Sequence, residues 1–354
     1  MEFLPKALGT RPRLACEVRA EGVVCAFAED AAGMLGAVSR TNLADGVLAA
    51  GLKRGNIVDR SAVVAAVRTT LDAVAGAGRT RHVTLVVPDA AVRVLLLDFD
   101  VLPSKPVEAL SVVRFRLKKL LPFDAEDAVV SYQVMSSAKN MVQVVAVAMP
   151  REVLAEYEAM VIAAGYLPGA VLPSTLAALA GLEEAEASAL VVNVSEQQVT
   201  TAIVRGGVLL LHRSLDMTET VGAELPVVMP VVDPESSALE WAQQEAISPE
   251  AARRADVMDV VQIRESDEAA AARDVTQAVS VAAAYFEDTL RAAPQVVLAA
   301  GTLGAETLDQ MLRMSGLEGL RVKELMESSM IAVGAVTAGV SRGWLAGVRG
   351  ALTS

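Results

Sequence analysis

Residues 83–124 read VTLVVPDAAVRVLLLDFDVLPSKPVEALSVVRFRLKKLLPFD, and this stretch carries the strongest fold signal in the chain. Val83–Val87 and Val92–Leu97 are short runs of β-branched and apolar residues, a pattern typical of buried strands. Over residues 105–121 the apolar side chains recur at helical spacing, which predicts an amphipathic helix that ends before Pro122. The stretch therefore predicts two strands followed by a helix.

Two further strands and a second helix are predicted after this stretch. Strand-like runs cover Ala128–Met135 and Val142–Met149, separated by a polar break. An amphipathic helix is predicted over Glu152–Ala164 and ends at Gly165. The order strand, helix, strand, strand, helix, strand is that of a small α+β (βαββαβ) module.

The composition limits the class of protein. A chain of 354 residues can bury more than one core, and its residues are 53% hydrophobic but only 3% aromatic. An interior of Ala, Val and Leu suits an α/β protein. Asp and Glu outnumber Lys and Arg by 43 to 31, and the net charge of −12 argues against nucleic acid or an anionic membrane surface as direct partner. Short basic segments of a partner protein would be attracted.

The module resembles the inserted subdomain of PilM, the cytoplasmic actin-like assembly protein of type IV pili, which is similar to the cell-division protein FtsA. The matching features occur in the family's order, and they are Pro88-Asp89, Leu121-Pro122-Phe123-Asp124, Tyr132-Gln133 and Ala164-Gly165-Tyr166. The resemblance implies an α/β protein with the actin-like (ribonuclease H-like) duplicated two-lobe fold, in which the module is an insertion. A meander of strands and turns that opens near residue 14 and again near residue 189 agrees with such a duplication.

The domain prediction divides the chain into three parts. They are a first lobe at 13–90 and 171–187, an inserted subdomain at 91–170, and a second lobe at 188–354. Residues 13–87 are predicted as a hairpin, a loop, a helix over Ser61–Ala75 and a strand. In the second lobe the pattern loosens at about 216–274, which predicts a small, irregular and mostly exposed subdomain before a helix over Thr276–Ala292.

The resemblance also locates a candidate nucleotide cleft. Proteins of this fold hold phosphates between two hairpin turns, one from each lobe, where glycines let backbone N–H groups approach and an aspartate positions the metal. A third, glycine-rich loop packs on the adenosine. The corresponding residues of this chain form a degenerate set: Glu17, Arg19, Gly22, Asn193, Ser195, Thr200, Gly301 and Thr302.

Each of the three segments departs from the pattern that the family implies. In the first turn Glu17 stands for the aspartate and Arg19 stands where glycine would allow close approach; in the second, Asn193 replaces the carboxylate and Ser195 the glycine. The third loop keeps only Gly301 of a glycine pair. A Cβ in the turns displaces the backbone from phosphate, and a lost metal-positioning carboxylate costs orders of magnitude in rate. We therefore expect a pseudo-ATPase scaffold without catalytic residues or cofactor, while ATP binding and ATP hydrolysis stay open as alternatives.

Metal chemistry is not expected. His82 and His212 are the only histidines, and Cys16 and Cys25 show no ligand spacing. The two cysteines lie nine residues apart on the arms of one predicted hairpin, so a disulfide is geometrically conceivable. In a cytosolic protein two buried thiols are the expected state.

The resemblance implies a function in binding. PilM relatives lie beneath the inner membrane and capture the short cytoplasmic N-terminal tail of a single-span membrane protein, PilN. By this resemblance the chain is a cytoplasmic scaffold of pilus assembly, associated with the membrane through a PilN-like partner. The tail would dock in a groove between the first lobe and the inserted subdomain, near the strand end at Val83–Asp89.

Two further interpretations stay open. One is a GspL-like scaffold of type II secretion, which is also actin-like; that family usually continues into a transmembrane helix, and the sequence shows neither such a helix nor a signal peptide. The other concerns a basic cluster beside the first predicted helix of the module, which is either a solvated face or an edge for an acidic partner. Its members are Arg114, Arg116, Lys118 and Lys119.

Overall fold

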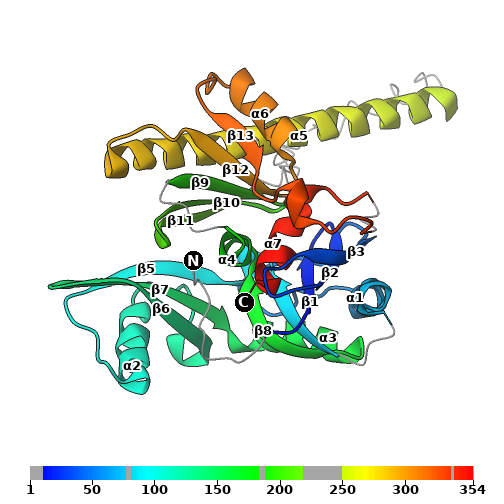
Figure 1. The fold of residues 1–354 in the computed structure, drawn as a ribbon. Helices are drawn as coiled ribbons and strands as arrows, with labels where there is room; N and C mark the ends of the chain where they lie inside the picture. The colour runs from blue at the N-terminus through cyan, green and yellow to red at the C-terminus, as the bar shows by residue number, and fades with distance from the viewer. Residues whose placement is uncertain (1–10, 77–80, 183–187, 218–248, 336–338, 354) are drawn as a thin grey trace, which may run out of the picture.

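The computed structural model describes residues 11–76, 81–182, 188–217, 249–335 and 339–353, with the backbone alone for 249–268. These residues form two lobes, each built on a five-stranded sheet, and a smaller three-stranded module beside the first lobe (Figure 1). The two five-stranded sheets share one topology, which confirms the duplicated actin-like α/β fold that the sequence predicted.

The first lobe has the strand order β3-β2-β1-β4-β8. β1, β2 and β3 form an antiparallel meander, and β4 and β8 add in parallel. β4 is buried at five of its six positions, which explains why its sequence reads as a continuous apolar run. The elements are β1 (Leu14–Arg19), β2 (Gly22–Ala28), β3 (Leu35–Asn42), α1 (Arg60–Ala75), β4 (His82–Val87) and β8 (Leu167–Pro173).

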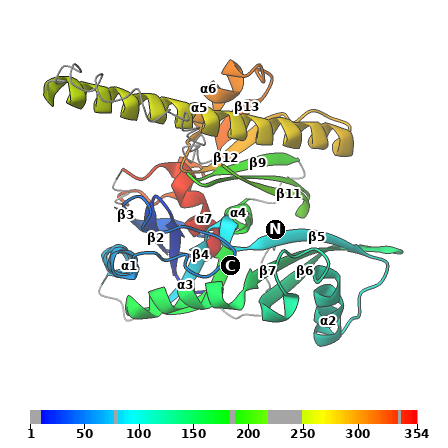
Figure 2. The same cartoon turned by 180° about the vertical axis from the view of Figure 1, so that it is seen from behind.

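The second lobe repeats this plan with the order β11-β10-β9-β12-β13. β9, β10 and β11 are antiparallel, and β12 and β13 extend the sheet in parallel. Two helices, α5 and α6, pack on the outer face of this sheet (Figure 2). The elements are β9 (Ala189–Val194), β10 (Gln198–Arg205), β11 (Val208–Asp216), α5 (Pro249–Leu290), β12 (Val296–Gly301), α6 (Ala305–Met314) and β13 (Arg321–Glu324).

The inserted module has the predicted element order, but its last strand belongs elsewhere. The three-stranded antiparallel sheet β5-β7-β6 carries α2 on one face, where Val113 and Leu117 pack against Val144. α3 packs in the first lobe's core, and β8 pairs with β4 rather than with the module, because α3 returns the chain to that sheet. The elements are β5 (Arg93–Phe99), α2 (Pro106–Leu117), β6 (Ala128–Ala138), β7 (Met141–Pro150) and α3 (Arg151–Ala163).

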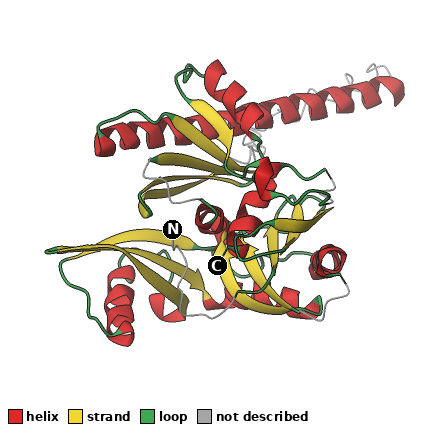
Figure 3. Ribbon diagram, in the orientation of Figure 1, coloured by secondary structure: helices red, strands yellow, loops and turns green. Residues whose placement is uncertain are grey.

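A core shared by both lobes lies between their sheets. It is formed by inward-facing residues of both sheets together with α4 (Ser174–Ala180) and the helix α7 (Arg342–Leu352). Figure 3 shows helices in the space between the sheets of the two lobes. Every residue from Gly343 to Leu352 is buried. Glycines allow this close packing: an added Cβ at Gly347 would lie 2.3 Å from a Glu17 carboxylate oxygen. α7 therefore acts as a wedge that both lobes contact.

The structure extends or changes three of the sequence predictions. β13 and α7 were not predicted, and the third strand of the first meander, β3, was predicted without bounds. From Pro249 the chain is one continuous helix, α5, so this part of the segment at about 216–274 is helical rather than irregular; residues 218–248 lie outside the described part. Cys16 and Cys25 are register partners on β1 and β2 and are free, buried thiols. Within the described residues, no helix combines the length and apolarity needed to cross a bilayer.

The α7 wedge generates a stability prediction. A Gly350→Ala substitution would place a Cβ 1.9 Å from the carbonyl oxygen of Ala177 in α4. Glycine to alanine in an exposed helix stabilises by about 1 kcal/mol, but this overpacking should lower the free energy of unfolding by about 1–3 kcal/mol. Urea denaturation measures the free energy of unfolding. The control is Gly319→Ala, whose added Cβ would have no atom within 4 Å and which should leave the midpoint unchanged. Coincident unfolding curves for the two variants would contradict the close packing of α7 against α4.

Candidate functional site

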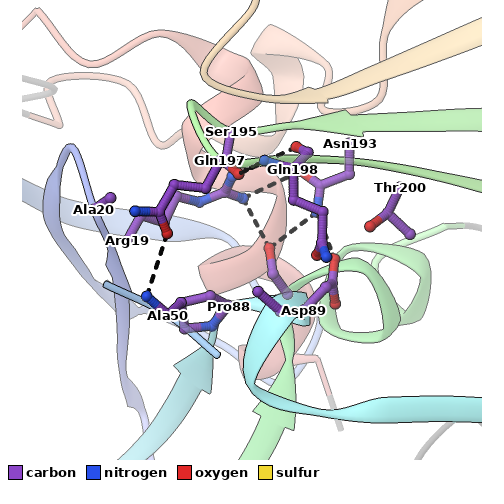
Figure 4. A pocket seen from close by; sticks show the side chains of 12 residues that line it. Arg19, Ala20, Ala50, Pro88, Asp89, Asn193, Ser195, Gln197, Gln198 and Thr200 are labelled. Carbon is purple, nitrogen blue, oxygen red and sulfur yellow. Dashed lines mark hydrogen bonds between the residues drawn. The ribbon is translucent and has the colours of Figure 1, made fainter. Parts of the chain in front are cut away.

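The cleft between the lobes is the candidate site, because the two hairpin turns at its mouth face each other. The β1–β2 turn follows Arg19, and the β9–β10 turn follows Val194. Figure 4 shows side chains from both turns converging with Asp89, which follows β4. The duplicated fold thus brings Arg19 and Asn193 together across 174 residues of sequence.

Arg19 joins the two lobes. Its Nε donates to Glu17 Oε1 at 2.8 Å within the first lobe, and its Nη1 donates to the carbonyl oxygen of Val194 at 3.3 Å in the second. Nη2 donates to Asn193 Oδ1 at 3.2 Å and to Ser174 Oγ at 2.8 Å. The guanidinium is only 4% exposed, and every one of its nitrogens has a partner. Its hydrogen-bonding capacity is directed to protein groups.

Asn193 extends the network toward Asp89. Its Nδ2 donates to Ser174 Oγ at 3.0 Å and to Thr175 Oγ1 at 2.9 Å, both at the start of α4. Thr175 in turn donates its hydroxyl and backbone N–H to the Asp89 carboxylate. The amide at position 193 is well suited to this role, since it accepts from Arg19 and donates to hydroxyls at the same time. A carboxylate at 193 could not donate.

Little space is left in this part of the cleft. The enclosed cavity among these residues measures about 20 Å³, which is room for about one water molecule. Its wall includes Ala50, whose backbone N–H donates to Gln197 Oε1 at 3.2 Å and so links the first lobe to the second turn (Figure 4). No cluster of three or more potential metal ligands occurs among the described residues.

The buried ion pair sets the electrostatics of the site. Burial raises the pKa of Glu17, and the neighbouring Arg19 and Ser174 offset this only in part. Burial alone would lower the pKa of Arg19, but the carboxylates of Glu17, Glu21 and Asp89 outweigh it and raise that pKa. Glu17 Oε2 faces the α7 wedge and has no hydrogen-bond partner in the described part of the chain. The arginine therefore stays charged and carries the interaction between the lobes.

A carboxylate from the β1–β2 turn binds the backbone of the β9–β10 turn. Glu21, in the β1–β2 turn, accepts a short hydrogen bond from the backbone N–H of Glu196. In a phosphate-binding turn such N–H groups would face the phosphate oxygens. Burial raises the pKa of Glu196, and the nearby Glu21 and Asp45 add to the effect. The β9–β10 turn thus binds a carboxylate of the protein itself, that of Glu21.

The third loop is closed in a similar way. Gly301 adopts φ 89°, and an added Cβ there would lie 2.0 Å from the carbonyl oxygen of Val194. The Thr302 N–H and hydroxyl both donate to that oxygen, at 2.8 and 3.2 Å. Glu324 Oε1 on β13 accepts from the Ala305 N–H at 2.9 Å, at the start of α6. The loop therefore binds the second lobe's own backbone and a glutamate.

The other predicted residues have local roles. Gly22 packs against β3, where an added Cβ would lie 2.6 Å from the carbonyl oxygen of Thr41. Ser195 closes its own turn through hydrogen bonds with Gln198, and Thr200 pairs with Ser214 on β11 at 2.9 Å. Ser195 and Thr200 line the small cavity, whereas Gly22 does not.

Several residues of the network were not identified from the sequence as site residues. Asp89 was predicted only as a strand end, and the adjacent pair that starts α4 was not predicted as part of the site. Asp89 follows β4, and the pair that starts α4 follows β8. A polar residue shortly after a buried strand indicates the edge of the sheet where ligands bind, and this pattern could have identified them. Nothing local distinguishes Glu21 or Glu324, whose partners are far away in sequence. The residues missed are Glu21, Asp89, Ser174, Thr175 and Glu324.

A larger cavity opens beside the filled cleft. It measures about 610 Å³ and lies where the first lobe, the start of β5 and the second lobe meet. Its wall comprises the loop 49–55 together with Ala90, Arg93, Gln197, Asp216 and Met217. A polar cavity of about 180 Å³ adjoins it and shares Arg93 and Asp216.

Several solved structures are similar to this chain, to different degrees. A chain of the PilM–PilN type IV pilus biogenesis complex is similar over 96% of this chain and 98% of that one, with a TM-score of 0.68 and 17% identity. The cytoplasmic domain of EpsL, an inner membrane component of the type II secretion system of Vibrio cholerae, gives 0.38 and 13% over 58% of this chain and 71% of that one. A Bacteroides thetaiotaomicron protein with an actin-like ATPase fold gives 0.44 and 9% over 88% and 90%. No protein-family model and no curated protein matches the sequence. The likeness to the PilM–PilN chain establishes a shared fold.

The Arg19 network generates a prediction with a pH signature. Arg19→Met should lower the free energy of unfolding by about 3–5 kcal/mol at pH 7.5, since it leaves Glu17 buried without its cation. Losing the cation raises the already raised pKa of Glu17 further. The folded variant then binds a proton that the unfolded chain releases, so its stability deficit should shrink as the pH falls from 7.5 toward 5.

Urea unfolding of wild type and variant at pH 7.5 and 5.5 measures this effect. The double variant Glu17→Gln/Arg19→Met is the control, because it has no carboxylate at position 17 to titrate. A deficit of equal size at both pH values in the single variant would show that Glu17 is not the group responsible.

Proposed function

We propose that this chain is a nucleotide-independent scaffold of type IV pilus assembly that binds the short cytoplasmic tail of a PilN-like inner-membrane protein. The fold shared with a chain of the PilM–PilN complex over 96% of the sequence supports the pathway. The observation that carries the proposal is the cleft itself, which is filled by Arg19, Asn193 and their partners. In this view the protein is an adaptor and no enzyme.

Three features argue against nucleotide as the ligand. Arg19 already donates its hydrogen bonds to protein groups. If it bound a phosphate instead, the buried Glu17 carboxylate would lose its cation. The carboxylate of Glu21 already accepts from the second turn and would repel an incoming phosphate. The cavity directly between the two hairpin turns holds about 20 Å³, far below the several hundred Å³ of an ordinary small-molecule site.

The open cavity of about 610 Å³ offers a docking place for a peptide. It lies next to Ala90, directly after the strand end at Val83–Asp89, and it borders both the first lobe and the start of the inserted module. The cavity is near the strand end at which the sequence resemblance placed the tail groove, but its wall also includes Gln197, Asp216 and Met217 of the second lobe, which that prediction did not include. A single-span partner that docks there would keep the protein at the cytoplasmic face of the inner membrane.

The proposal predicts that magnesium and ATP do not bind. Isothermal titration of the protein with up to 1 mM MgATP should give no heat above dilution, because the phosphate-facing N–H groups already have partners. ATP should likewise leave the thermal midpoint unchanged. A saturable, magnesium-dependent signal at micromolar ATP would support the alternative of an active actin-like ATPase.

The proposal also predicts tail binding at the open cavity. A synthetic peptide of the cytoplasmic tail of the pilus membrane protein encoded beside this chain should bind with micromolar affinity in fluorescence anisotropy. Ala90→Trp should weaken it at least tenfold, because the indole fills the cavity. Ala138→Trp, at the exposed end of β6, is the matched control and should bind like wild type. Undiminished binding by Ala90→Trp would place the tail elsewhere.

A further inference from the structure

The open cavity differs in charge from the rest of the protein. The chain carries a net charge of −12, yet three cationic side chains and a single carboxylate line this cavity. The cations are Lys53, Arg54 and Arg93, and the carboxylate is Asp216. A net negative charge alone favours basic partners, but the local field at a binding site is set by the groups that line it. This cavity therefore favours an anionic group.

The cations at 53 and 54 have no counter-charge of their own. Neither Lys53 nor Arg54 forms an ion pair with any residue that the structure describes, and both are exposed. The one acidic residue of the wall, Asp216, accepts from Gln198 Nε2 at 2.7 Å. Arg93 donates to the carbonyl oxygen of its neighbour Val92. On the loop, the nearest printed carboxylate contact is that of Glu156, which binds the backbone N–H groups of Gly55 and Asn56 and leaves the side chains of Lys53 and Arg54 without an ion pair among the described residues.

The loop that carries these cations is held in place from within. Asn56 is 1% exposed; its Oδ1 accepts from the Gly51 N–H at 2.8 Å and its Nδ2 donates to the Lys53 carbonyl at 2.6 Å. The buried Tyr157 of α3 donates its hydroxyl to the same Asn56 Oδ1 at 3.2 Å. Glu156 accepts from two backbone N–H groups of the loop, at 2.6 and 2.9 Å. A preorganised loop that presents unpaired charge is typical of a recognition surface.

The wall also contains apolar side chains. Besides the charged groups, the cavity is lined by Ala49, Ala50, Leu52, Ala90 and Met217. A free inorganic anion would use only the cations, whereas a peptide with neighbouring acidic and apolar side chains would use the whole wall. The mixture favours a peptide.

We propose that the cavity recognises an acidic side chain, Asp or Glu, next to an apolar residue in an extended segment of the partner's tail, with Lys53 and Arg54 as the residues that bind the carboxylate. This inference rests on the proposed function and specifies the chemistry of the tail. It reverses, for this one site, the expectation of a basic partner that the net charge alone supports.

The test combines charge reversal with tail variants. Lys53→Glu/Arg54→Glu should weaken binding of the tail peptide at least tenfold, while Lys139→Glu/Lys323→Glu, two exposed lysines outside the cavity, makes the same change in net charge and should bind like wild type. Replacing each Asp or Glu of the tail by its amide should identify one position with a comparable loss. If Lys53→Glu/Arg54→Glu binds as well as wild type, or if a tail without acidic residues binds undiminished, this inference fails and the proposed function stands.

A second measurement does not depend on the tail. ¹⁵N-labelled protein is titrated with acetyl-Glu-Leu-Glu-amide and, separately, with acetyl-Lys-Leu-Lys-amide. The acidic peptide should shift amide signals of residues 49–56 and of Arg93, and the basic one should not. If both peptides shift these signals equally, or if only the basic one does, the assignment is overturned whatever the natural partner is. If the acidic peptide binds but no tail does, the proposed function fails and the chemistry of the site stands.

Discussion

The two lobes meet around one buried guanidinium. Arg19 pairs with Glu17 on its own strand and reaches Asn193 and Val194 on the equivalent strand of the other lobe. In a nucleotide-binding member of such a fold, the ligand's phosphates would lie between these strands and supply negative charge at the junction. Here a charged side chain and an amide take that place. A buried ion pair adds little net stability over apolar packing, but breaking it is costly, so it fixes the relative position of the lobes more than it stabilises either.

Three further contacts between groups of the protein lie around the cleft. Glu21 accepts from the N–H of the second turn, Glu324 accepts from the first turn of α6, and the glycine face of α7 packs against Glu17. Each of these contacts is made by a group of the protein itself. Together they join the two lobes through groups of the chain itself, as the scaffold proposed above requires.

Sequence reasoning succeeded where the signal was local. The strands from Val83 to Met149 were predicted because their apolar runs are continuous, and Arg19 and Asn193 were selected because they break a glycine and carboxylate pattern. α7 was missed because it is buried on every side, from Gly343 to Leu352, so that no polar face marks it as an amphipathic helix. The loop at 49–56 gave no signal, since Asn56 and Glu156 meet across a hundred residues. Contacts of that kind exist only once the fold has formed.

The position of α7 in the chain has a consequence for the order of assembly. Residues 342–352 complete a core whose other members include Ala15 and Val24, more than three hundred residues earlier. During synthesis the first sheet therefore leaves the ribosome long before α7, the helix that covers its inner face. Until α7 has been synthesised, this apolar face is exposed to solvent or covered by another protein. Such long sequence separations slow folding, because loop closure precedes the contacts that reward it. Both halves of the molecule thus acquire their final stability in one late, concerted step.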